Sequence, residues 1–155
     1  TVGSGWVHAV AFSPDGNKLM WVAHDCTISV ATCGGAEPAV VVYRCDLLPF
    51  QSCIFLDDRT LIAAGHDNSP YKFSFDGSSI KFECDIDSAV SSKGPSNISA
   101  MSKFKNLDKL AQSGSVDTST NKKTHANTIT CLNLLSNNTI ASSGLDCKIV
   151  IWDKF

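Results

Sequence analysis

Three times along this chain a short apolar run ends in a turn that carries Asp, and a second run with β-strand character follows the turn. The three residues are Asp25, Asp67 and Asp146. Asp25 and Asp67 are 42 residues apart, whereas Asp67 and Asp146 are 79 apart, which is one such period plus 37 additional residues. A period of about 40–45 residues is typical of repeat architectures, which carry function on surfaces and insertions rather than in one catalytic cleft.

Each repeat consists of short predicted strands separated by tight turns. In the first repeat Pro14 presets φ for a turn and Gly16 accepts its left-handed position. The predicted strands are 6–12, 18–23, 27–32 and 39–44 in the first repeat, 50–56, 60–64, 71–75 and 80–84 in the second, and 128–135, 139–143 and 148–152 in the third. Four short strands with tight turns form one blade of a β-propeller, so the sequence predicts an all-β, WD-repeat β-propeller fold.

The repeats correspond to about three blades, at 6–45, 46–86 and 125–155. A closed propeller usually takes about four to eight blades, and each blade buries both faces against its neighbours. We therefore expect the chain to be the C-terminal part of one propeller domain, a seven-bladed ring. The last blade has no predicted fourth strand, and we expect the remaining part of the ring to supply it.

The third repeat also contains the residue types of a polar network that makes such blades rigid. In well-formed WD repeats a His before the first strand, a Ser or Thr on the second, an Asp in the turn and a Trp on the third are hydrogen-bonded. The candidates for this structural tetrad are His125, Ser142 or Ser143, Asp146 and Trp152. A buried carboxylate and a buried imidazole are tolerated because each forms a hydrogen bond with the next group of the network.

The other two repeats retain less of this pattern. The first keeps His8 and Asp25 without a Trp, and in the second only Asp67 is clear. We therefore assign the complete network to the third repeat alone.

The additional residues form an insertion at 87–124, before the last blade, which we expect to be a flexible arm rich in Ser, Asn, Lys, Thr and Gly. Within it, helical spacing predicts an amphipathic helix at about 99–111, with Ser99 as N-cap and Gly114 as a stop. The apolar face of this helix carries the predicted partner-binding residues Met101, Phe104, Leu107 and Leu110.

Two placements of that apolar face are open. It either folds back onto the propeller or docks in a groove of a partner protein. Residues 88–124 contain six Lys and two Asp, a net charge of +4, which leaves −6 for the rest of the chain. A basic arm on an acidic body favours an acidic protein partner. The arm has no Arg and no aromatic platform, so we expect no nucleic-acid partner.

The sequence offers little support for a metal site, a membrane-spanning segment or a disulfide framework. The seven Cys residues are an odd number and lie mostly among apolar strand residues, which favours buried thiols in a reducing compartment. A zinc site from His24, Cys26 and Cys33, with or without Cys45, lacks a supporting Cys-x-x-Cys pair, so we predict no metal and no cofactor. No apolar run approaches the roughly 18 residues of a membrane span.

A catalytic interpretation has two candidate features. The dipeptides His24-Asp25 and His66-Asp67 look like paired metal ligands, but they recur at the repeat-periodic turns, where Asp caps backbone N–H groups. A Cys–His nucleophile pair distant in sequence stays open, although nothing distinguishes one thiol. We predict no catalytic residues and no enzymatic activity.

Four segments, at 5–13, 23–30, 61–67 and 104–109, resemble the propeller subunit (subunit 1) of the actin-related protein 2/3 complex. The blade segments are unspecific. The segment Phe-Lys-Asn-Leu-Asp-Lys at 104–109, within an insertion before the last blade, is more specific. The resemblance covers nearly the whole chain as the C-terminal half of the family.

The resemblance implies a non-catalytic structural subunit of the cytoplasm and actin cytoskeleton, in a complex that nucleates branched actin filaments. The implied partners are the other subunits, the actin filament and the acidic tail of a nucleation-promoting factor. The family's inserted helix contacts actin or an actin-related subunit, a role that carries over onto Met101, Phe104, Leu107 and Leu110. The alternative is another WD-repeat scaffold, such as a substrate adaptor, which would have no reason to keep this helix.

Overall fold

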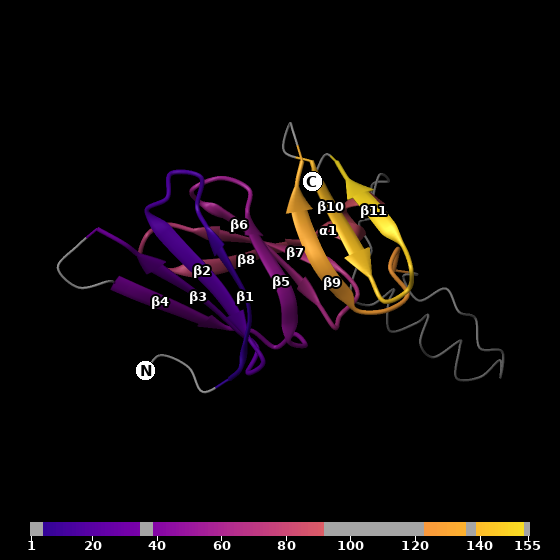
Figure 1. Ribbon diagram of the computed structural model, residues 1–155, viewed down its shortest axis with the longest axis horizontal. Helices are drawn as coiled ribbons and strands as arrows, with labels where there is room; N and C mark the ends of the chain where they lie inside the picture. Colours follow the sequence, from indigo (N-terminus) through magenta and orange to yellow (C-terminus); the bar gives the residue numbers. More distant parts are fainter. Residues whose placement is uncertain (1–4, 35–38, 92–122, 136–138, 154–155) are drawn as a thin grey trace, which may run out of the picture.

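Three antiparallel β-sheets stand side by side along the molecule (Figure 1). The computed structural model describes residues 5–34, 39–91, 123–135 and 139–153. The first sheet has the order β1-β2-β3-β4, with β1 Val7–Phe12, β2 Lys18–Ala23, β3 Thr27–Thr32 and β4 Ala39–Arg44. The second has the order β5-β6-β7-β8, with β5 Phe50–Phe55, β6 Thr60–Gly65, β7 Pro70–Phe75 and β8 Ile80–Asp85. The third has the order β11-β10-β9, with β9 Ile129–Leu134, β10 Ile140–Gly144 and β11 Ile149–Trp152.

This architecture confirms the predicted fold class, an all-β protein built from propeller-like blades. Every predicted strand is present, and its bounds differ from the prediction by at most one residue at either end. The predicted turn glycine Gly16 has a φ of 73°, in the left-handed region that glycine adopts without steric cost.

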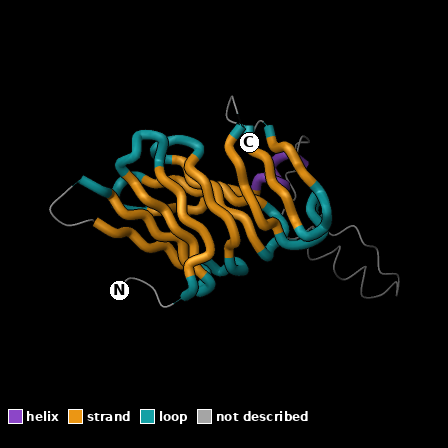
Figure 2. The backbone as a smooth tube through the Cα atoms, in the orientation of Figure 1, coloured by secondary structure: helices purple, strands orange, loops and turns teal. Residues whose placement is uncertain are grey.

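A short helix, α1 at Ile86–Ser91, follows β8 and contacts β7 and β8; it is the purple segment in Figure 2. The sequence analysis did not predict it, because six residues are too few for a periodic pattern. Its start is set by Asp85, whose Oδ1 accepts the backbone N–H of Asp87 at 3.0 Å, as an N-cap residue does. The predicted helix at 99–111 lies outside the described residues.

Neighbouring sheets contact each other mainly through their first strands, since β1 lies against β5 and β5 against β9. Two apolar cores fill the spaces between the sheets. The core between the first and second sheets includes Met20, Ile28, Phe50, Phe55, Leu61 and Phe73. The core between the second and third sheets includes Ile62, Ile86, Ile129, Ile140 and Trp152.

Strand β6 shows how one sheet serves both cores. Leu61 and Ala63 belong to the first core, while Ile62 and Ala64 belong to the second. Successive side chains of a strand point to opposite faces, so a strand between two cores must be apolar at every position. That requirement accounts for the uninterrupted run Leu-Ile-Ala-Ala in β6.

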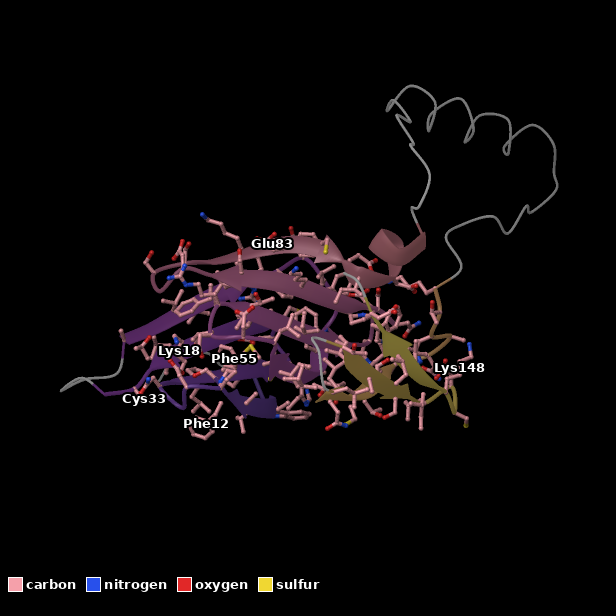
Figure 3. The ribbon with its side chains drawn as sticks, turned by 90° about the horizontal axis from the view of Figure 1, so that it is seen from above. Phe12, Lys18, Cys33, Phe55, Glu83 and Lys148 are labelled. Atoms are coloured by element: carbon pink, nitrogen blue, oxygen red, sulfur yellow. The ribbon has the colours of Figure 1, made fainter. Side chains whose placement is uncertain are left out.

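The outer faces of the first and third sheets are apolar and exposed. Val10 and Phe12 on β1 have relative exposures of 62% and 65%, and Ile149 and Ile151 on β11 have 78% and 55%. Figure 3 shows Phe12 at one edge of the molecule and Glu83, from the outer strand β8, at the opposite edge. In the described part of the chain, no helix has the length and apolar character to span a membrane.

Candidate functional site

The three Asp-bearing turns adopt the same backbone conformation. The residue after each Asp has a φ of 62°, a value that few residues other than glycine adopt. These residues are Cys26, Asn68 and Cys147. The N–H of each donates at 3.2 Å to the carbonyl three positions earlier in the turn. The turns are therefore equivalent positions of one structural repeat.

A second hydrogen bond recurs at each turn and ties it to the start of its sheet. The residue before each Asp donates its N–H to a carbonyl just before the first strand. The pairs are His24 to Trp6 at 2.8 Å, His66 to Pro49 at 3.2 Å and Leu145 to Thr128 at 2.9 Å. The Asp residues therefore lie at the same end of each sheet.

In the third sheet the structure brings the four tetrad candidates together in one hydrogen-bonded chain. Nδ1 of His125 lies 3.0 Å from Oδ1 of Asp146, and Nε2 of His125 lies 2.8 Å from Oγ of Ser142. The indole N–H of Trp152 donates to the same Oγ at 2.8 Å. Between the two candidate serines, the structure thus places Ser142 in the network.

The network is buried and its polar groups are satisfied. His125, Ser142 and Trp152 have relative exposures of 1%, 1% and 3%. Within the described residues, no buried side-chain nitrogen or oxygen lacks a hydrogen-bond partner. Such an arrangement fixes the relative positions of β10, β11 and the segment before β9.

The carboxylate of Asp146 is held in its ionised form. Burial alone would raise its pKa, but the N–H of Ala126, the His125 ring and the N–H of Lys148 lower the pKa to about 2. The Ala126 N–H donates to Oδ2 at 2.9 Å. Lys148 Nζ also lies 3.7 Å from the same oxygen. Asp146 is therefore a hydrogen-bond acceptor and not an acid at neutral pH.

The first two sheets carry smaller hydrogen-bonded groups that contain histidine near their Asp turns. Nε2 of His8 lies 3.0 Å from Nδ1 of His24, and burial, followed by the nearby His24 and His66, lowers the pKa of His8. His66 lies 2.9 Å from Nε2 of Gln51 and 3.1 Å from Oγ1 of Thr128. The latter contact links the second sheet to the segment that precedes the third.

The two ends of the insertion meet at the body of the protein. Asp87, in α1, accepts two hydrogen bonds from Thr124: from the backbone N–H at 2.7 Å and from Oγ1 at 2.6 Å. Lys123 donates from Nζ to the carbonyl of Asp67 at 2.5 Å, and Nζ lies 5.7 Å from the ring centre of Tyr71. Thr124 lies 37 residues after Asp87 and Lys123 lies 56 residues after Asp67, so no local sequence pattern predicts these contacts.

The predicted partner-binding residues Met101, Phe104, Leu107 and Leu110 lie outside the described residues. Among the cysteines of the considered zinc site, Cys45 donates from Sγ to the carbonyl of Cys26 at 3.2 Å, and Cys33 is exposed. Among the described residues, no three His, Cys, Asp or Glu side chains are grouped so as to hold a metal ion. Burial raises the pKa of the Cys53 thiol to about 12, which makes it an unreactive core residue.

The sequence analysis missed the conformation of Cys26 and Cys147. Asn68 is a residue type enriched in the left-handed region, and its place in the repeat was the available signal for the other two positions. Aligning the three turns by their Asp residues would have transferred the conformation from Asn68 to the two cysteines.

Comparison with known proteins places these features in a family context. The WD domain, G-beta repeat family (WD40) matches residues 1–31 and 116–153. These two stretches contain the first and third Asp turns, including the complete hydrogen-bonded network. The matched stretches leave out the second repeat, in which the sequence pattern is weakest.

The chain is also similar along most of its length to proteins of one kind. It is 39% identical to actin-related protein 2/3 complex subunit 1A-B of Xenopus laevis, in an alignment that covers 96% of this chain and 41% of that relative. Subunit 1B-A of the same species is 34% identical, with coverages of 96% and 42%. Subunit 1 of Schizosaccharomyces pombe is 28% identical, with coverages of 96% and 45%. The chain thus spans less than half the length of these relatives.

Proposed function

This chain belongs to the WD-repeat family and is homologous to subunit 1 of the actin-related protein 2/3 complex, and from that relationship we propose that it is a non-catalytic structural subunit of such a complex. In that role it supports actin nucleation and branched filament formation in the cytoplasm. Its partners are the other subunits, the actin filament and the acidic tail of a nucleation-promoting factor.

The observation that carries this proposal is the extent of the similarity, which is 39% identity across 96% of the chain. Similarity confined to blade motifs would have indicated a WD repeat and nothing more, because a blade serves many functions. The aligned region also includes the insertion, which a general WD-repeat adaptor has no reason to share. The repeated, fully hydrogen-bonded turns support a scaffold role.

We further propose that additional blades cover the two exposed apolar faces and complete one propeller domain. Phe12 and Val10 line one face, and Ile149 and Ile151 line the other. Water-exposed apolar areas of this kind on both end sheets are typical of repeat units that lack their neighbours. The relatives are more than twice as long as the aligned region, so they have room for further repeats.

Within this proposal the arm at 87–124 is the contact with actin or an actin-related subunit. Its apolar residues Met101, Phe104, Leu107 and Leu110 dock in a groove of that partner as one face of a helix. The net charge of +4 at 88–124 favours an acidic partner surface, and the charge of −6 on the rest of the chain keeps the body away from that surface.

The test uses the full-length protein in its assembled complex. Met101→Asp combined with Phe104→Asp should leave assembly intact and lower the rate of branch formation. The matched control is Ser102→Asp with Asn106→Asp, which adds the same charge off the apolar face. Equal branching by the two double variants would contradict the docking role. Mass spectrometry of co-purifying proteins tests the wider proposal, which fails if the companions include no actin-like proteins.

A further inference from the structure

We propose that Cys26 and Cys45 form a redox-sensitive pair, which a low-molecular-weight disulfide such as oxidised glutathione converts into a cross-strand disulfide. Both thiols are free in this structure. Cys26 lies in the first Asp turn and immediately precedes β3, and Cys45 immediately follows β4. The pair lies wholly at one end of the first sheet, and nothing in it depends on the proposed role of the chain in a complex.

The two cysteines lie opposite each other at the end of the β3–β4 ladder. The last pair of the ladder is Thr27 with Arg44, and one step further the N–H of Cys45 donates to the carbonyl of Cys26 at 3.1 Å. The Cα atoms of a hydrogen-bonded antiparallel pair are about 5.5 Å apart, and a disulfide joins Cα atoms that are about 4.4–6.8 Å apart. The backbone spacing at this position is therefore one that a disulfide spans.

Both side chains lie on the same face of the first sheet. Residues directly opposite each other in an antiparallel pair share a face, and Cys26 and Cys45 both pack against the core between the first and second sheets. Sγ of Cys45 donates to the carbonyl oxygen of Cys26 at 3.2 Å. The thiol of Cys45 is therefore turned towards Cys26.

The two thiols differ in their access to solvent, and this difference sets the order in which they react. Cys45 is buried, with a relative exposure of 9%, whereas Cys26 is half-buried. Burial raises the pKa of the Cys45 thiol, and the nearby Cys26 raises it further. Because the thiolate is the reactive form, Cys45 reacts slowly with a reagent from solvent. Cys26 is therefore the attacking thiol, and Cys45 is the thiol that resolves the mixed disulfide.

The reaction consists of two successive thiol–disulfide exchanges. The thiolate of Cys26 attacks one sulfur of oxidised glutathione, forms a mixed disulfide and releases one glutathione thiolate. Cys45 then loses its proton and attacks Sγ of Cys26, which breaks the mixed disulfide and releases the second glutathione thiolate. The two protein thiols lose two electrons, the glutathione disulfide gains them, and the two protons end on the two released glutathione molecules.

The new bond would join the first Asp turn to the segment that leads into the second sheet. In that segment the N–H of Leu48 donates to Oδ2 of Asp67 at 2.7 Å, in the second Asp turn. A bond between residues 19 positions apart also restricts the unfolded chain, so it stabilises the folded one. Opposite Cβ atoms in a sheet are about 4.5–5.5 Å apart, whereas those of a disulfide are about 3.8 Å apart, so the strands must approach more closely. This strain keeps the disulfide easily reduced, as a reversible modification requires.

The experiment treats the reduced full-length protein with oxidised glutathione at graded ratios to reduced glutathione. Remaining thiols are blocked by alkylation, and mass spectrometry of unreduced peptides identifies the linked residues. Cys26→Ser and Cys45→Ser each remove one partner. The matched control is Cys33→Ser, because Cys33 directly follows the other end of β3 and is exposed (Figure 3). Alkylation of Cys53, which has a relative exposure of 4%, reports whether the protein unfolds during the reaction.

We expect a peptide pair linked through Cys26 and Cys45 in the unmodified protein and in Cys33→Ser, while Cys53 stays unalkylated. Cys45→Ser should stop at the mixed disulfide on Cys26. In Cys26→Ser, glutathione should modify Cys45 about tenfold more slowly than it modifies Cys26 in Cys45→Ser, because a buried thiol is less ionised and less accessible. Oxidation should raise the unfolding temperature of the unmodified protein by about 2 °C or more and leave that of Cys45→Ser unchanged.

Several results in the unmodified protein would overturn the pair, whether or not each variant folds. One is a mixed disulfide that persists on Cys26 while Cys45 stays a free thiol, and another is a link from either cysteine to a different cysteine. A link that forms only as fast as Cys53 is alkylated would assign the reaction to the unfolded chain. An unfolding temperature that oxidation leaves unchanged would show that the bond does not constrain the first sheet.

Discussion

The indole N–H of Trp152 donates to Oγ of Ser142 at 2.8 Å, and both side chains are almost completely buried. This contact joins β11 to β10 in addition to the ladder between them, in which Ser142 is paired with Val150. Because the same hydroxyl lies 2.8 Å from Nε2 of His125, a single oxygen connects two strands with the segment that follows the arm.

Removing that oxygen should destabilise the third sheet. Ser142→Ala leaves the N–H of Trp152 and Nε2 of His125 buried without a partner, which costs about 1–3 kcal/mol for an unsatisfied group. Ser143→Ala is the control, since Ser143 is the adjacent and less buried residue. Chemical unfolding of the full-length protein measures both. Equal losses of stability for the two variants would contradict the central place of Ser142.

The ionised state of Asp146 predicts a specific dependence of stability on pH. Its pKa of about 2 in the folded chain is below the value of about 3.9 expected for an unfolded Asp. The unfolded state therefore binds the proton more readily, and the contribution of Asp146 is fully present above about pH 4 and is lost as the pH falls towards 2.

Asp146→Asn should lower the melting temperature at pH 7, and the difference from the unmodified protein should shrink between about pH 4 and pH 2. Hydrogen bonds from Ser13 and Ser79 respectively hold the pKa values of Asp15 and Asp76 well below their ordinary range, so these two groups also make stability depend on pH in acid. They are present in both proteins, so the comparison isolates Asp146. A difference that stays constant down to pH 2 would contradict this assignment.

The strand pattern was predictable from sequence because it depends on local rules. Turn residues such as Pro14 and Gly16 separate the strands, and apolar runs such as that of β6 mark the buried ones. Because the repeat supplies the same pattern three times, weak signals in one blade were supported by the others. The four tetrad candidates came instead from the residue pattern of well-formed WD repeats, which only the third repeat retains in full.

The contacts between distant segments were not predictable in this way. The pairing of Asp87 with Thr124 depends on where the second and third sheets meet, and α1 depends on the cap from Asp85 and on the burial of Ile86. None of these has a periodic or compositional signature. The left-handed residues Cys26 and Cys147 were missed because cysteine has no preference for that conformation.

The conformation of Cys147 predicts a stabilising substitution. Its φ of 62° is the value that Asn68 adopts at the equivalent position of the second repeat. Asn tolerates this region better than other residues with a side chain, and Cys147 is exposed, so little packing is lost. Cys147→Asn should raise the free energy of unfolding by about 0.5–1 kcal/mol. Cys147→Ala is the control, since it removes the thiol and keeps the strain, and an equal gain would assign the effect to the thiol.

The exposed face of the first sheet gives a test of the proposed complete propeller. Phe12 has a relative exposure of 65% in this chain, as a residue of a solvated surface would. If a further blade covers it, Phe12→Asp in the full-length protein buries an unpaired carboxylate and should cost about 3 kcal/mol or more. Leu48→Asp is the matched control, because Leu48 is 52% exposed and lies in the loop between β4 and β5. It should change stability by no more than about 0.5 kcal/mol. Similar small effects of both substitutions on the unfolding midpoint would mean that the face of β1 remains in water and that no blade covers it.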